Sequence, residues 1–286
     1  MTRRWRSWWE AAPEAGIYIG AGCVATAAVE PDRARRLKFS RVDPLPPGAV
    51  VPSPVESNIR DSGLVVDRLK EATAPSRWTE VAISLPDPTV RVAILELARV
   101  PARRADRNAL FQHHLERLFL NALGRCRFAY QRLPSPESDG RQRVLVSAIR
   151  EEILEEYEAV ARAAGLLPAV VDIAAFHLYN LYEGQIVSSL QPSQWALFLN
   201  LFDQNFTIIL LDHEGPRFIR IKALPSDSGG GLAGADLAAR VTAEIDASVR
   251  AAQTAADVEE PPLINRLFFF SDQPLAGLDE EMRSAY

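Results

Sequence analysis

The chain has 286 residues, 48% of them hydrophobic and 24% charged, which is enough for a sizeable core and one to two globular domains. The formal net charge of −5 excludes the chain-wide positive field that non-specific binding of nucleic acid requires, so we expect no nucleic-acid partner. Two distant cysteines indicate neither a disulfide framework nor a thiolate metal site, and no apolar run approaches the ~20 residues of a membrane span, so we expect a cytoplasmic protein.

The chain opens with "MTRRWRSWWEAAPE", in which arginines and tryptophans alternate. Tryptophan favours the lipid headgroup region and arginine is attracted to anionic lipid. One interpretation is therefore contact with a membrane surface or a partner; the other is a short element that caps the first strand, or a tail without fixed structure. The six residues concerned are Arg3, Arg4, Trp5, Arg6, Trp8 and Trp9.

The stretch "GIYIGAGCVATAAVE", residues 16–30, predicts a strand, a tight glycine turn and a second strand, and residues 37–42 predict a third strand. A Pro-rich loop follows and forbids both helix and central strand. After it, "DSGLVVDRLKEATA" predicts a helix capped by Asp61 or Ser62, because apolar residues recur at helical spacing.

The middle of the chain alternates strands with one amphipathic helix. The expected strands are 79–86, 90–101, 126–133 and 141–150, and the expected helix is 107–123. Taken together, residues 45–143 are predicted to form a small α/β subdomain inserted between two halves of another.

The pattern changes after Ser147. Expected in order are a helix ending at Gly165, a strand over 168–174, a helix over 175–184, three strands within 195–224, a Gly-rich break, a helix from Leu237 to about Ala252, and the strand "INRLFFFS". Each lobe opens with antiparallel strands and closes with helix and strand, which favours a duplicated α/β architecture.

Several segments spread over nearly the whole chain, among them "GIYIGAG", "VAISLP" and "FTIILLDHEGPRFIR", follow the pattern of a known family. Through them the sequence resembles the PilM family of type IV pilus assembly proteins, which have the actin-like ATPase superfold and are relatives of the cell-division protein FtsA. Its strongest part is "AGLLPAVVDIAAFHLYNLYE", residues 164–183.

The resemblance implies an α/β, actin-like (ribonuclease H-like) fold of two lobes with an inserted FtsA-like subdomain. We expect the first lobe over residues 1–44 and 144–190, the insert over 45–143, and a shortened second lobe over 191–286. After "SGGG" the chain goes almost at once into a helix, so the wall that usually borders the nucleotide base is expected to be missing.

The resemblance also implies a function. Members are cytoplasmic, dock at the inner membrane on the cytosolic tail of PilN, and link it to the pilus motor. The type II secretion system uses related L-type proteins with a membrane span. The implied partners are thus a PilN-like tail and motor or platform proteins, and a homo-oligomeric ring is compatible with the fold.

Active relatives hold nucleotide at three places, and this sequence departs from each. In the first turn Gly20 matches, but Tyr18 stands where relatives have the aspartate that holds Mg²⁺ through water, and a phenol is a poor substitute at neutral pH. The position near Ala25, often lysine, is also uncharged.

The second and third places show the same loss. Alignment on "FTIILLDHEGPRFIR" puts Asn200 and Phe202 at the second, where the ring of Phe202 would block approach of the backbone to phosphate. A Gly-Gly pair is replaced by Asp272 and Gln273 at the third.

We therefore expect a degenerate ATPase without ATP or Mg²⁺, without catalytic residues and without a metal site. An actin-like protein that still binds ATP and switches state is the alternative. "SDSGGGLAGAD" lacks the lysine of a phosphate-binding loop and indicates a connector. The histidines have no partner at ligand spacing, and the glutamates of "REEILEEYE" form a solvated helix face.

Overall fold

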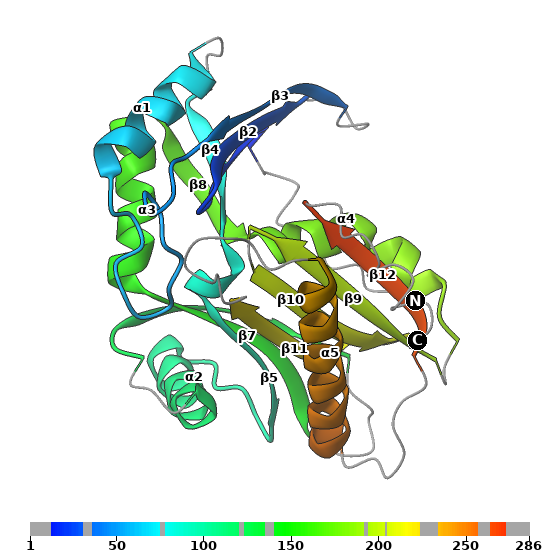
Figure 1. Cartoon of the computed structure of the whole chain (residues 1–286). Helices are drawn as coiled ribbons and strands as arrows, with labels where there is room; N and C mark the ends of the chain where they lie inside the picture. The colour runs from blue at the N-terminus through cyan, green and yellow to red at the C-terminus, as the bar shows by residue number, and fades with distance from the viewer. Residues whose placement is uncertain are drawn as a thin grey trace. The chain divides into compact units, whose positions relative to one another are not determined.

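The computed structural model describes residues 13–30, 36–74, 78–119, 123–134, 140–191, 194–203, 205–223, 234–256 and 264–272 (Figure 1). The chain forms two compact units. The first combines the described residues up to Thr89 with Arg150–His177, and the second combines Val90–Ile149 with the described residues from Leu178 onward.

The first unit is built on a five-stranded sheet with the order β3-β2-β1-β4-β8. Its strands are β1 (Ala15–Ile19), β2 (Cys23–Val29), β3 (Leu37–Pro44), β4 (Glu80–Leu85) and β8 (Leu167–Ile173). The first three form an antiparallel meander, whereas β4 runs parallel to β1 and β8 parallel to β4. Helix α1 (Ser62–Thr73) lies against β2 and β3, and α3 (Glu151–Ala163) lies against β8 and α1.

Local signals explain both helices. The side chain of Asp61 accepts from the backbone N–H of Leu64 at 3.0 Å, which confirms an N-cap, and Val65 and Leu69 are fully buried. Helix α3 ends where Gly165 adopts a φ of 85°, a left-handed conformation that glycine accepts without strain.

Hydrogen bonds with two side chains fix the Pro-rich loop between β3 and α1. One side chain belongs to α3, and the other is that of Arg150, the N-cap residue of α3. The Glu156 carboxylate accepts from the backbone N–H groups of Asn58 at 2.7 Å and Ile59 at 3.1 Å. Arg150 donates to the carbonyl of Val55 at 2.5 Å. The loop therefore has a defined path, to which one isolated β-bridge between Val50 and Ile59 also contributes.

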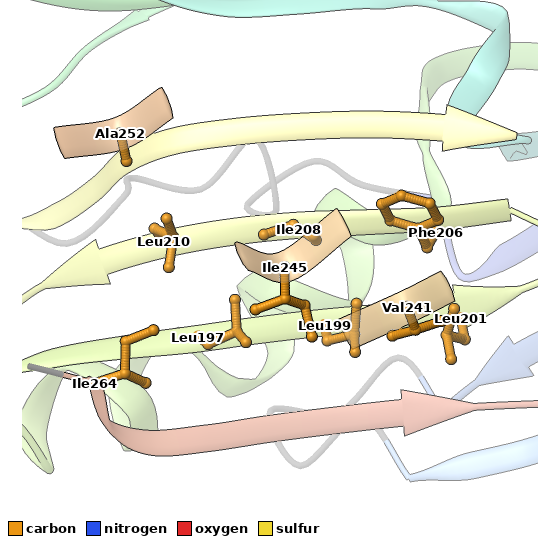
Figure 2. Packing of buried hydrophobic residues seen from close by; sticks show 10 residues of the cluster. All are labelled: Leu197, Leu199, Leu201, Phe206, Ile208, Leu210, Val241, Ile245, Ala252 and Ile264. Atoms are coloured by element: carbon orange, nitrogen blue, oxygen red, sulfur yellow. The ribbon is translucent and has the colours of Figure 1, made fainter. Parts of the chain in front are cut away.

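The second unit contains a four-stranded sheet with the order β11-β10-β9-β12. Its strands are β9 (Trp195–Phe202), β10 (Asn205–Asp212), β11 (Gly215–Ala223) and β12 (Ile264–Ser271). Helix α5 (Gly234–Ala256) places Val241, Ile245 and Ala252 against one face, where they meet the alternate apolar residues of β9 and β10 (Figure 2). All eight residues of β10 are buried, as expected for a strand covered on both faces.

Aromatic side chains of α4 (Ala174–Ser188) pack against other residues of the same sheet. Tyr179 meets Phe198 edge to face with ring centroids 5.7 Å apart, and Tyr182 meets Phe270 at 5.0 Å. Such pairs stabilise beyond the apolar area that they bury.

A three-stranded sheet with the order β5-β7-β6 completes the second unit. It consists of β5 (Arg91–Leu97), β6 (Cys126–Arg132) and β7 (Gln142–Arg150), with α2 (Arg104–Phe119) packed on it through Phe111 and Leu115. Arg143, only 5% exposed, donates to the carbonyls of Pro134 at 3.0 Å and of Pro216 on β11. Strand β5 also lies alongside β11.

The predicted strands and helices are confirmed in kind and order, but sheet membership differs from the expected division at residues 45–143. Helix α1 and β4 fall in that range yet belong to the first unit, because β4 pairs with β1 and β8. The three-stranded sheet begins only at Arg91, and β7 continues past the expected boundary to Arg150. Local patterns indicate a strand without revealing its partner, which explains the difference.

Candidate functional site

The first candidate turn joins β1 to β2. The backbone N–H of Gly20 donates to the carbonyl of Cys23 at 2.9 Å, and Leu45 donates to the carbonyl of Gly22 at 2.9 Å. Gly20 is buried. Its N–H thus closes the hairpin.

Tyr18 lies one residue before the end of β1 and is 8% exposed. Its neighbours across the sheet are Ala25 on β2 and Ser84 on β4, and the small residues Gly16 and Ala82 lie next along the same face. Small side chains beside an aromatic ring leave room for it. Tyr18 is therefore part of the packing of this sheet.

The second candidate turn joins β9 to β10. Asp203 adopts a φ of 53°, a left-handed conformation that aspartate accepts better than most residues. Its backbone N–H donates to the Asp272 carboxylate at 2.9 Å, and Asp272 donates its own N–H to the carbonyl of Leu201 at 3.2 Å. The carboxylate of Asp272 is therefore hydrogen-bonded to the main chain of the β9–β10 turn.

Asn200 and Phe202 lie on the face of β9 that also carries Phe198, whose ring meets Tyr179 of α4. Asn200 is 5% exposed and opposite the fully buried Thr207 of β10, while Phe202 is half-buried and opposite Asn205. The structure thus brings the predicted residues Asn200, Phe202 and Asp272 to one end of the second sheet. The role of Asp203 was not predicted, because the sequence of a two-residue turn does not indicate which group its backbone N–H will contact.

Other predicted residues lie outside the described part of the chain. They are Gln273, the Gly-rich break before α5, and the N-terminal Arg3, Arg4, Trp5, Arg6, Trp8 and Trp9. The contact interpretation of the N-terminal segment stays a prediction.

Buried carboxyl groups in the first unit have structural partners. Asp87 accepts from the backbone N–H of Ala175 at 2.9 Å, which caps α4. Asp172 and His177 interact electrostatically: burial raises the pKa of Asp172 and lowers that of His177, while each group opposes the shift of the other. The sequence predicted no metal-ligand partner for His177, and the structure places the carboxyl group of Asp172 near it.

In the second unit, burial raises the pKa of Glu183 on α4 to about 7. Burial also raises the pKa of Tyr179, one turn earlier. Over the ranges that the structure describes, no three His, Cys, Asp or Glu side chains come together as a metal site. No helix in those ranges has the length and hydropathy to span a membrane.

A family model described as type IV pilus assembly protein PilM matches residues 16–214. The chain belongs to the PilM family. The match includes the first turn and the second, but ends before α5 and β12, so Asp272 of this PilM-family chain lies beyond it. A comparison with curated protein sequences finds no match.

A solved structure shares the fold. A PilM–PilN type IV pilus biogenesis complex contains a chain with 20% identity and a TM-score of 0.63, over 85% of this chain and 69% of that chain. The cytoplasmic domain of EpsL, from the type II secretion system of Vibrio cholerae, has 10% identity and a TM-score of 0.48, with 95% of each chain covered. The TM-score of 0.63 shows that this PilM-family chain has the α/β fold of the chain in the PilM–PilN complex, as the resemblance implied.

Proposed function

We propose that this PilM-family protein is a non-catalytic scaffold of a type IV pilus assembly platform. It binds the cytosolic tail of a PilN-like inner-membrane protein and links it to the pilus motor, without ATP or Mg²⁺. It works at the cytoplasmic side of the inner membrane. Family membership supports the pilus role, and the solved PilM–PilN complex of the same fold supports the choice of partner.

The single observation that carries the non-catalytic part is the contact between Asp203 and Asp272. An actin-like protein that binds nucleotide needs main-chain N–H groups turned toward phosphate. In this chain a carboxylate already accepts from the N–H of the second turn at 2.9 Å. A phosphate there would have to displace a covalently tethered anion and would be repelled by it.

The first turn supports the same proposal. Tyr18 supplies a buried phenol in place of a carboxylate for Mg²⁺, and the N–H of Gly20 is bonded within the hairpin. In addition, only residues 224–233 separate β11 from α5, which is little chain for a helical wall beside a base. The three differences concern the carboxylate for Mg²⁺, the N–H groups for phosphate and the wall beside the base.

Calorimetry tests the proposal directly. We expect ATP with Mg²⁺, titrated to about 1 mM, to give no saturable heat with the full chain. Saturable binding at micromolar concentration would instead support the alternative, an actin-like protein regulated by its nucleotide state.

The partner is tested separately with a synthetic peptide. Its sequence should be the cytosolic tail of a PilN-like protein from the same organism, and a scrambled peptide of identical composition is the control. We expect saturable binding of the tail alone, unchanged by ATP. Equal binding of both peptides would contradict a specific scaffold role, whatever the outcome with ATP.

A further inference from the structure

Strand β3 is the outermost strand of the first sheet, and β2 is its only strand neighbour among the described residues (Figure 1). Two aliphatic side chains near its ends are exposed, Leu37 at 64% and Val42 at 66%. An exposed edge strand offers unpaired backbone groups to another chain. This one also offers apolar side chains.

The corresponding strand of the second sheet is covered. Strand β11 is likewise third in the meander and outermost in its sheet, but β5 lies alongside it and Arg143 donates to its Pro216 carbonyl. The two sheets share one strand order through four strands, so the comparison is between equivalent edges. The edge of β3 is the one that lacks a neighbour within the described part of the chain.

From Phe39 to Pro44 the strand pairs with β2 in regular register, and the one irregularity lies at Lys38. Side-chain contacts hold this regular part in place. On its α1 side, the ring of Phe39 meets Trp78 edge to face with centroids 5.5 Å apart. Arg41 donates to the Asp43 carboxylate at 2.7 and 2.9 Å and to the carbonyl of Glu71 in α1 at 3.1 Å. A partner strand would therefore meet a preformed template and would order little of this chain on binding.

The charge at this edge is positive, although the whole chain is acidic. Arg41 is compensated by Asp43, but Lys38 is exposed and forms no ion pair with any described residue. Arg36 is largely exposed and forms an ion pair with Glu30 at 4.0 Å. Pairing of β3 with β3 of a second copy would bring these positive charges together, which is unfavourable across strands.

We propose that the outer edge of β3 binds an extended, acidic segment of a different protein, which adds to the first sheet as a further strand. Backbone hydrogen bonds supply the affinity, Lys38 and Arg36 select carboxylates, and Val42 and Leu37 receive aliphatic side chains. This site is independent of the proposed PilN-like tail and of nucleotide.

Two blocked octapeptides test it with the full chain, one alternating valine with glutamate and the other valine with lysine. We expect the acidic peptide alone to bind, with affinity that falls as salt increases, and to slow hydrogen exchange of the amides of residues 37–44. Binding of both peptides, of neither, or without protection of β3 would overturn the proposal.

Matched charge reversals locate the site. Lys38→Glu should weaken binding of the acidic peptide at least tenfold, whereas Lys70→Glu, on an exposed position of α1, should leave it unchanged. Urea unfolding of both variants checks that each is folded. Equal loss in both variants, or a concentration-dependent dimer that Val42→Lys abolishes, would also overturn it.

Discussion

The backbone N–H of Asp203 donates to the carboxylate of Asp272, 69 residues later in the sequence, across 2.9 Å. This bond and the return bond from Asp272 to Leu201 join the β9–β10 turn to the end of β12. We expect Asp272→Ala to lower the free energy of unfolding by about 1 kcal/mol, because it removes an acceptor for a main-chain donor. Urea unfolding measures the effect.

Asp272→Asn is the matched control, since its amide oxygen can accept the same hydrogen bond; it should retain most of the stability. Neither variant should bind ATP in calorimetry. Saturable ATP binding by Asp272→Ala would mean that the carboxylate merely blocks a working nucleotide site.

Tyr18 gives a second prediction. Tyr18→Asp should fail to create ATP binding, because the other places remain changed, and should lower the free energy of unfolding by about 3 kcal/mol or more, since it replaces a buried ring by a buried carboxylate. Tyr18→Phe keeps the ring and should cost about 1 kcal/mol. Measurable ATP affinity of Tyr18→Asp would contradict the proposed loss of function.

A third prediction concerns the stability that Arg143 contributes. Its guanidinium is buried, and burial, together with Arg217, lowers its pKa to about 10, so it remains charged at neutral pH. Arg143→Met leaves the Pro134 and Pro216 carbonyls without this donor and should cost about 3 kcal/mol. Arg141→Met, at an exposed position two residues earlier, should change stability by less than about 0.5 kcal/mol. Similar losses in both variants would show that Arg143 has no special role.

The raised pKa of Glu183 predicts that the free energy of unfolding depends on pH. Its pKa rises from 4.5 in its ordinary state to about 7 in the folded chain, so between these values the folded state holds a proton that the unfolded state has lost. The free energy of unfolding should therefore fall as pH rises through this window. The full shift corresponds to about 3 kcal/mol, and we expect about 2 kcal/mol because Glu183 is only half-buried and solvent screens its charge.

Glu183→Gln should flatten that dependence and be more stable than the unmodified chain at pH 8. Glu155→Gln removes a carboxylate from the exposed face of α3 and should leave the slope unchanged. Urea titrations at several pH values between 5 and 8 compare the three proteins. A slope that survives in Glu183→Gln would assign the pH dependence to other groups.

Much of the fold follows from local sequence. The cap at Asp61, the stop at Gly165 and the three strand segments from Trp195 onward predicted elements that the structure contains. Local patterns could not predict which strands pair with each other. The sequence of β4 is typical of a buried strand in any sheet, and its pairing with Gly16 and Tyr18 of β1 places it in the first sheet.

The candidate site depends on a resemblance as well as on local pattern. The departures at Tyr18, Phe202 and Asp272 were expected from comparison with the motif of relatives, and their effect on nucleotide binding stays a prediction. The contact between Asp272 and the Asp203 N–H joins residues far apart in sequence, so no local pattern could reveal it. The burial of Arg143 was likewise hidden, because an arginine in a strand ordinarily indicates a face turned to solvent.

The burial of every residue of β10 also bears on synthesis of the protein. One face of this strand is covered by α5 and the neighbouring β9 is flanked by β12, and both of these elements leave the ribosome later. During translation the β9–β10 hairpin is thus made before its cover exists. Exposed apolar strands of this kind are prone to aggregate, so we expect the nascent chain to depend on chaperones until residue 271 has emerged.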